Sequence, residues 1–441
     1  MLAKFKKKYI GDWDFYQKYL LLAIPMILQN AITNLVSFLD NIMVGQLGTE
    51  QMSGVAIVNQ LIFVYNLAIF GAVSAASIFG AQYFGKGNHK GHMYSFRFKL
   101  YATLLVTGGA ILLFLTKGSA LISLYLTDTV GNGATDLALQ YGLEYLAIMM
   151  VGLIPFAVNQ SYATNIKETG QTFIPMLASF VAVGTNAILD YLMIFGIGPF
   201  PELGVQGAAL ATVIARYIEA LIVVIWAHIH RGKNRYLEGA YTGFGIPLAE
   251  LKAILIKGFP LMMNEVLWAA GMTTVTQCYS VRGLDVVAGL NIASTITNLF
   301  NIVYLQLGSC ISIVVGQYLG AGKLEDAKDA DNKMIVFSVF CCVIMAALMF
   351  VVGGFFPGIY NTTEEIRELA TSFIAVSAII MPFCAFSHAS YFTLRSGGKT
   401  GVTFLFDSVF TWVIVVPAAY LLAHFTGLGI VSIYFLVQGT D

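Results

Sequence analysis

Charged side chains are scarce in this sequence, since Asp, Glu, Lys and Arg make up only 11% of its 441 residues. Soluble domains carry roughly 25% of such residues, because their surface faces water. Hydrophobic residues account for 58% of the chain, and the mean hydropathy is +0.77. These proportions exclude an ordinary soluble enzyme and predict an all-α integral membrane protein surrounded by lipid.

Cysteine and net charge are also low. The formal net charge is zero, so nothing in the composition indicates a nucleic-acid partner. The six histidines are scattered, and we expect no metal site and no cofactor. The cysteines have neither disulfide nor zinc-site spacing and are predicted to be small packing residues: Cys278, Cys310, Cys341, Cys342 and Cys384.

Long apolar runs recur along the whole chain. At about 20 apolar residues per crossing, the length allows about twelve membrane-spanning helices. The last run stops at Asp441 after about half a span, and we therefore expect the last helix to be truncated. The runs lie at roughly 18–39, 54–79, 98–116, 137–158, 173–195, 206–228, 252–277, 286–315, 334–353, 369–392, 402–424 and 428–441.

The basic residues are distributed unevenly between the two sides of these spans. With a cytoplasmic N-terminus, the outer loops hold only Lys117, Arg282 and Arg367, and Arg216 falls inside a span; the other 20 of the 24 lie in cytoplasmic segments. Cytoplasmic loops carry such an excess in membrane proteins. The pattern predicts a multi-pass protein of the plasma (inner) membrane of a prokaryotic cell, with both termini cytoplasmic.

The sequence also contains an internal repeat. A shift of 235 residues superposes polar and small residues that apolar bias alone would not align, among them Pro25 on Pro260, Gln82 on Gln317 and Tyr83 on Tyr318. Six helices per repeat give two pseudo-symmetric six-helix lobes of like orientation. We expect an N-terminal lobe at 1–228, a cytoplasmic linker at 229–251 and a C-terminal lobe at 252–441.

Ionisable residues inside spans are functional candidates, because they are costly in hydrocarbon. Asp40 and Asp190 are predicted at similar depth, and two neighbouring buried carboxylates would share a proton or a cation. Asn186 lies one turn before Asp190. The alternative for each acid is a local hydrogen bond near a helix end. Asp40 closes a polar stripe on the first helix, formed by Asn30, Thr33, Asn34, Ser37, Asp40 and Asn41.

Other intramembrane groups are secondary candidates. Glu265 is the deepest acid of the second lobe, and Asp407 lies nearer the cytoplasmic side. Arg216 and Glu219 are spaced to form a structural ion pair along one helix. Two tyrosines of the fourth span could line an outer cavity, and two prolines inside spans could act as hinges: Tyr141 and Tyr145, and Pro25 and Pro260.

Several segments together resemble the multidrug and toxic compound extrusion (MATE) transporters over almost the whole chain. The first half has LDNIMVGQLG from Leu39, GAQYFGKGN from Gly80 and NAILDYLMIFG from Asn186. The second half repeats the theme with GFPLMMNE from Gly258 and VGQYLGAGK from Val315. No single motif is specific, but their order and twofold recurrence are.

The resemblance implies a cation-coupled antiporter, most simply a monomer, that expels small organic and often cationic or lipophilic compounds by alternating access. In the DinF-like branch the matching coupling positions are Asp40, Asn186 and Asp190, with Thr212 as a fourth. In the NorM-like branch the second lobe adds a Glu, matched by Glu265, and an Asp. Where that Asp is expected, this chain has Cys384. We therefore expect proton coupling in a DinF-like transporter, with sodium coupling as the alternative.

Other classes fit less well. A flippase of lipid-linked precursors needs a basic cleft, and Arg216 is the only basic residue within a predicted span. An intramembrane enzyme needs a nucleophile with a base or paired metal ligands, and neither pattern is present. No nucleotide-binding motif occurs either, so an ion gradient is the expected energy source. A channel stays open as an alternative, which uphill flux would exclude.

Overall fold

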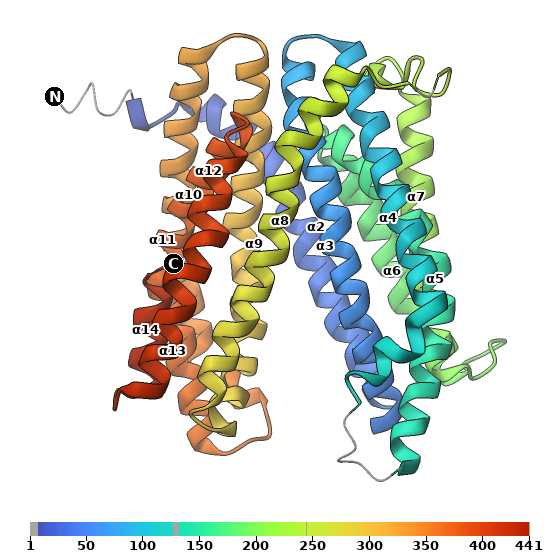
Figure 1. Ribbon diagram of the computed structural model, residues 1–441, viewed down its shortest axis with the longest axis vertical. Helices are drawn as coiled ribbons and strands as arrows, with labels where there is room; N and C mark the ends of the chain where they lie inside the picture. The colour runs from blue at the N-terminus through green and yellow to red at the C-terminus, as the bar shows by residue number, and fades with distance from the viewer. Residues whose placement is uncertain (1–7, 127–131, 244, 441) are drawn as a thin grey trace. The chain divides into compact units, whose positions relative to one another are not determined.

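The structure, a computed structural model, describes residues 8–126, 132–243 and 245–440, and every regular element within these ranges is helical (Figure 1). In lipid, helices satisfy all backbone hydrogen bonds within one segment, which is why a strongly apolar chain folds this way. Large apolar side chains lie on helix surfaces: Leu105 is 77% exposed and Phe383 is 72% exposed. The prediction of an all-α integral membrane protein is confirmed.

Eleven of the described helical segments are long and apolar enough to cross a membrane. The twelfth predicted span corresponds to the shorter helix α14 (Ile430–Gln438). The N-terminal half contains α2 (Trp13–Gly45), α3 (Thr49–Gly85), α4 (His89–Ser123), α5 (Asn132–Glu168), α6 (Phe173–Phe195) and α7 (Gly204–Ile229). The C-terminal half contains α8 (Leu248–Ser280), α9 (Leu284–Gly320), α10 (Leu324–Gly353), α11 (Glu364–Ser396), α12 (Thr400–Phe404) and α13 (Val416–Phe425).

The last long span is not a regular α-helix throughout. Between α12 and α13 the chain runs through two π-helical stretches, η3 (Leu405–Val409) and η4 (Thr411–Val415). Two short 3-10 turns lie in connections, η1 (Arg235–Leu237) after α7 and η2 (Phe356–Ile359) after α10. π-Helical turns are rare and concentrate at functional sites, so the residues around η3 are candidates for a functional site.

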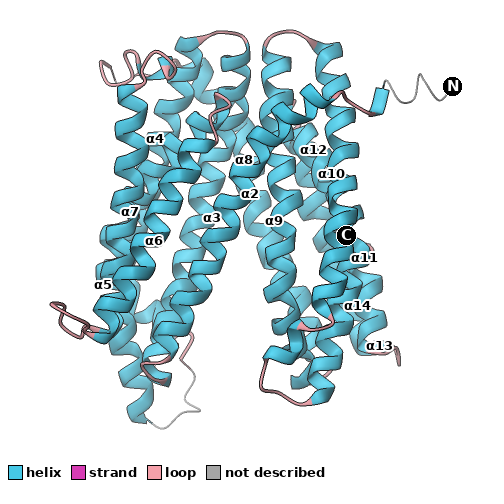
Figure 2. Cartoon of the chain, turned by 180° about the vertical axis from the view of Figure 1, so that it is seen from behind, coloured by secondary structure: helices cyan, strands magenta, loops and turns pink. Residues whose placement is uncertain are grey.

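The internal repeat is visible in the backbone. Adding 235 to the bounds of α2 and α3 gives the bounds of α8 and α9. Gly87 and Gly322, which the same shift superposes, both adopt left-handed backbone angles, with φ of 71° and 73°. Only glycine adopts that conformation without a steric cost, so the turn after α3 and the turn after α9 both depend on it. The repeated sequence therefore folds into repeated local structure (Figure 2).

The chain forms two compact units. The N-terminal unit comprises residues 24–84 and 88–254, and the C-terminal unit comprises residues 1–23, 85–87 and 255–441. Each has its own apolar core, with Leu146 and Met149 fully buried in the first and Phe373 and Ile374 in the second. In the N-terminal unit α7 packs against α5 and α6, and in the C-terminal unit α11 packs against α9 and α10. The predicted lobe and linker boundaries stay a prediction.

Candidate functional site

The N-terminal unit brings two acids from different helices together. Asp190 of α6 is 1% exposed, and the carboxyl group of Asp40 of α2 is its interacting neighbour. No described donor hydrogen-bonds to either carboxyl oxygen of Asp190, or to Oδ1 of Asp40. Ionised carboxylates only accept hydrogen bonds, so two facing carboxylates need a proton or a cation between them. The pair therefore stays the candidate site for one proton or cation.

The polar neighbours of this pair come from α6 and α7. Asn186, 6% exposed and one turn before Asp190, donates from Nδ2 to Oγ1 of Thr212 over 3.4 Å. This contact joins two of the residues that the sequence grouped with Asp40 and Asp190. Small residues along α7, including Ala208 and Ala209, are buried and let the helices approach closely.

Four side chains of the polar stripe, those of Asn30, Thr33, Asn34 and Ser37, donate to backbone carbonyls of α2 itself. Asn34 donates from Nδ2 to the carbonyl of Asn30 over 2.9 Å, and Ser37 donates to the carbonyl of Thr33 over 3.0 Å. These side chains are exposed on the described surface, apart from Asn30, which is half-buried. The stripe therefore offers polar surface that its own unit does not use. Asn34 does not contact the acid pair directly in any described hydrogen bond.

The two tyrosine candidates on α5 lie in different surroundings. Tyr145 is 5% exposed, donates to Oδ1 of Asn59 over 3.3 Å, and has Asp40 and Asp190 as electrostatic neighbours. Tyr141 is half-buried and packs against the core of its unit instead. Of the two tyrosines, Tyr145 is therefore the electrostatic neighbour of the acid pair.

The predicted ion pair within α7 is wrong. Arg216 donates to the carbonyl of Gly152 over 3.4 Å and lies 5.2 Å from the ring of Phe156. Glu219 accepts a hydrogen bond from Ser179 of α6. Among the described residues these two side chains form no ion pair within 4.0 Å, because each has a closer partner on a neighbouring helix. Residues three apart can pair, but interhelical packing decides the outcome here.

The C-terminal unit also gathers polar groups. Oε1 of Glu265, on α8, lies 4.0 Å from Nη1 of Arg395, on α11. Asn264, the preceding residue, is 2% exposed and donates from Nδ2 to Oδ2 of Asp407 over 2.6 Å. Ser408 donates to the side-chain oxygen of Asn264 over 2.7 Å. Two sequence candidates, Glu265 and Asp407, therefore lie in one cluster.

Asp407 and Ser408 lie in the π-helical stretch η3. The wider turn there coincides with the contacts that both residues make with Asn264 of α8. His388, four residues after Cys384, contacts the carbonyl of Cys384 and lies 4.8 Å from the ring of Tyr304. The charged neighbours of Glu265 are thus Arg395 and Asp407, and His388 is not among them.

Two proline candidates lie inside helices. Pro25 interrupts the hydrogen bonding of α2 and Pro260 that of α8, at positions related by the repeat. Both helices continue past the proline without a break in the described backbone. Their role as hinges stays a prediction.

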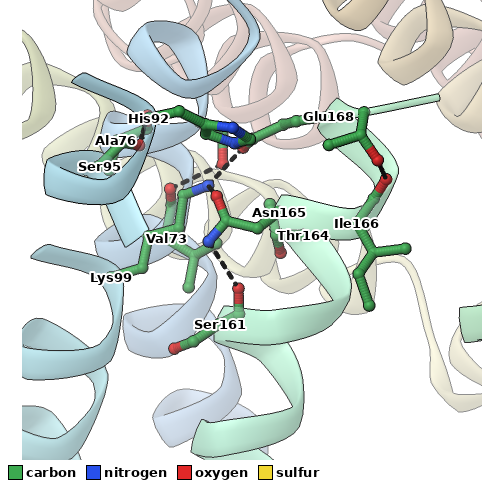
Figure 3. A network of polar contacts seen from close by, with 12 residues as sticks. Val73, Ala76, His92, Ser95, Lys99, Ser161, Thr164, Asn165, Ile166 and Glu168 are labelled. Atoms are coloured by element: carbon green, nitrogen blue, oxygen red, sulfur yellow. Dashed lines mark hydrogen bonds and ion pairs between the residues drawn. The ribbon is translucent and has the colours of Figure 1, made fainter. Parts of the chain in front are cut away.

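Sequence reasoning missed a buried ionic network at one end of α4 and α5. Nζ of Lys99 lies 2.5 Å from Oε1 of Glu168 and 3.0 Å from Oδ1 of Asn165 (Figure 3). His92 reaches Oε2 of Glu168 over 3.3 Å. Lys99 is 0% exposed, Glu168 2% and His92 1%. A fully buried ammonium is tolerated because a carboxylate and an amide oxygen bond to it.

A periodicity argument would have found this network. His92, Ser95 and Lys99 follow the spacing of one helix face, and so do Ser161, Asn165 and Glu168. Lys99 is among the 20 basic residues that were assigned to cytoplasmic segments. The statement that only Arg216 is basic within a span is also wrong, since Lys99 and Arg395 are buried in helices. Both have acidic neighbours, so they do not form a basic cleft.

A family profile and similar proteins both relate this chain to multidrug transporters. The MatE family profile matches residues 25–192 and 260–421, which is more than half of the chain. A probable multidrug resistance protein NorM of Thermotoga maritima is 23% identical over 413 residues, covering 93% of this chain and 86% of that protein. The corresponding NorM protein of Halalkalibacterium halodurans is 24% identical and covers 93% and 88%.

Solved structures show the same fold. An outward-facing multidrug resistance MATE family transporter has a TM-score of 0.85 at 20% identity, covering 98% of this chain and 93% of that one. A MOP superfamily transporter from Pyrococcus furiosus has a TM-score of 0.84 at 20% identity, covering 97% and 94%.

Proposed function

Because this chain belongs to the MATE family of multidrug efflux transporters, we propose that it is a cation-coupled antiporter that exports organic, often cationic, compounds by alternating access. It is a multi-pass membrane transporter and not an enzyme. As part of the same proposal, the protein acts as a monomer and has both termini in the cytoplasm.

The observation that carries the proposal is the buried pair of Asp40 and Asp190. A single proton between the two carboxyl groups removes their mutual repulsion and supplies the donor that their oxygens lack. When water and a cationic substrate reach the site, the proton leaves and the carboxylates bind the substrate's positive charge. The hydrogen bond between Asn186 and Thr212 fixes these two polar side chains beside Asp190.

The coupling ion is proposed to be a proton rather than sodium. Na⁺ and other hard cations prefer several oxygen ligands around them, as the coordination of Ca²⁺ and Mg²⁺ illustrates. A proton shared between two carboxyl groups needs no further ligand, and the pair of Asp40 and Asp190 supplies those two groups. Sodium coupling is the second candidate, and its support is the similarity to NorM proteins together with Glu265 in the C-terminal unit.

A flippase of lipid-linked precursors is not proposed. Recognition of a pyrophosphate needs unpaired basic groups, ideally Arg in a bidentate geometry. The buried basic residues Lys99 and Arg395 each have a carboxylate neighbour, at 2.5 and 4.0 Å. Arg97, also buried, donates to three backbone carbonyls.

The energy source gives the first prediction. Efflux of a fluorescent cation such as ethidium should collapse when the proton gradient is dissipated while ATP is held constant. In liposomes, an imposed pH gradient alone should drive uphill export, and an imposed sodium gradient alone should not. A sodium gradient that drives export without a pH gradient would reverse the choice of ion. Export that follows ATP with both gradients abolished would contradict antiport.

Membrane orientation gives the second prediction, which rests on the distribution of Lys and Arg. Single cysteines at two exposed positions, Lys233 and Lys323, should react with an impermeant thiol reagent only from the cytoplasm. Cysteines at Gly198 and Asn361, also exposed, should react from outside in intact cells. External labelling at Lys323 would invert the proposed topology.

A further inference from the structure

The connection between α7 and α8 has the composition of a flexible linker, with Gly, Lys, Arg and Asn between residues 230 and 247. Its structure is different. Asn234 and Tyr236 are 0% exposed, and Leu237 and Ala240 are 5% and 4% exposed. Flexible linkers do not bury their side chains, because burial requires a fixed surface to pack against. Residues 234–243 therefore form part of the N-terminal unit.

One buried arginine of α4 fastens this segment. Arg97 is 6% exposed, and its guanidinium donates to three backbone carbonyls of the connection. Nε reaches Ala240 over 2.9 Å, Nη1 reaches Gly245 over 2.7 Å and Nη2 reaches Gly239 over 2.6 Å. Hydrogen bonds from a charged donor are about twice as strong as neutral ones, and the planar guanidinium fixes their directions. A lysine at position 97 could not make all three contacts with this geometry.

Aromatic rings pack the rest of the segment against the same unit. The ring of Tyr236 lies 5.2 Å from that of Phe96 and 4.9 Å from that of His92, both on α4. Burial raises the pKa of Tyr236 well above its usual value, so its hydroxyl stays neutral. The hydroxyl of Tyr241 contacts that of Tyr162, and its ring stacks on His228 at 5.8 Å. Contacts from α4, α5 and α7 thus converge on ten residues.

The first turns of α8 are held by the same unit. Glu250 accepts a hydrogen bond from the hydroxyl of Tyr83, and Ile254 is 0% exposed in a cluster with Ala75 and Ala76. The chain passes into the C-terminal unit only at Leu255, inside α8.

We propose that residues 234–243 and Gly245 form a strap, fastened to α4 by Arg97, that moves as a fixed part of the N-terminal unit. The connection is then not the flexible joint between the two repeats. Along this connection, a motion of one unit relative to the other acts on the body of α8 and not on the strap, because the strap and the first turns of that helix are anchored before the chain changes unit at Leu255. This inference concerns only the mechanics of the chain, and it does not depend on the coupling ion or the substrate.

Hydrogen–deuterium exchange of the whole protein in nanodiscs tests the strap. The amides of Leu237, Glu238 and Ala240 donate to Asn234, Arg235 and Leu237 in closed turns. Peptides covering 234–243 should therefore be protected in the native protein. Arg97→Ala should accelerate their exchange by about tenfold or more, because local opening then needs less free energy, while peptides from the core of α9 stay unchanged. Arg97→Lys should give an intermediate rate.

The matched control is Lys233→Ala, which removes an exposed basic residue of the same connection and should leave all rates unchanged. Exchange of 234–243 at the rate of an unstructured peptide in the native protein would overturn the proposal. So would unchanged protection in Arg97→Ala. Because no gradient or substrate is present, the result is independent of whether the protein proves to be a proton-coupled antiporter.

Discussion

Asp40→Asn is expected to abolish gradient-driven efflux while expression and membrane insertion stay normal. The substitution keeps the shape and hydrogen-bonding capacity of the side chain but removes its titration. Without the second carboxyl group, Asp190 no longer shares a proton, so the free energy of the gradient is not passed to the substrate. Asp190→Asn should give nearly the same loss. The measurement is ethidium export from cells and from liposomes with an imposed pH gradient.

Asp407→Asn is the matched control for that prediction. Asp407 is also a carboxylate within a span, but it accepts a hydrogen bond from the amide of Asn264, whereas no described donor bonds to the carboxyl oxygens of Asp190. Its loss should be milder, with a substantial fraction of export retained. Lowering the pH should also weaken substrate binding in the native protein, and do so much less in Asp40→Asn. Uphill export at the native rate by Asp40→Asn would show that coupling lies elsewhere, with Glu265 as the next candidate.

Lys99→Met is expected to destabilise the protein by about 3–5 kcal/mol, because it leaves the buried carboxylate of Glu168 without its ammonium partner. Asn165 and His92 cannot replace that charge, since Asn165 is neutral and the His92 side chain is itself fully buried. The measurement is the midpoint of thermal or chemical unfolding in detergent. The double variant Lys99→Met with Glu168→Gln should recover much of the loss, because no uncompensated charge remains.

An exposed ion pair of the same protein provides the comparison. Lys328 and Glu325 on α10 lie 2.9 Å apart, with side chains 71% and 86% exposed. Exposed pairs contribute little because water screens them, so Lys328→Met should leave the midpoint unchanged within error. Equal effects of Lys99→Met and Lys328→Met would mean that Lys99 and Glu168 do not form a buried ion pair.

The composition, the apolar runs and the internal repeat determined most of the fold. A chain this apolar can satisfy its backbone in lipid only as helices, so its class follows from hydropathy alone. The shift of 235 residues found in the sequence is also the shift between the bounds of α2 and α8. Asp40 and Asp190 could be selected from sequence because an acidic side chain inside a span costs free energy, which makes it a functional candidate.

Tertiary structure decided which side chains meet. Arg216 and Glu219 satisfy the spacing rule for a pair, yet each bonds to another helix, because interhelical distances are set by packing and not by spacing along the chain. Asn264 and Asp407 lie far apart in sequence and join across the π-helical stretch η3. The connection after α7 has a polar, glycine-containing sequence, which favours a loop. Its fixed position depends on contacts with other helices, above all the three hydrogen bonds that Arg97 donates to its carbonyls. Composition limits the conformations that a segment can adopt, whereas contacts with neighbouring helices determine whether one of them is fixed.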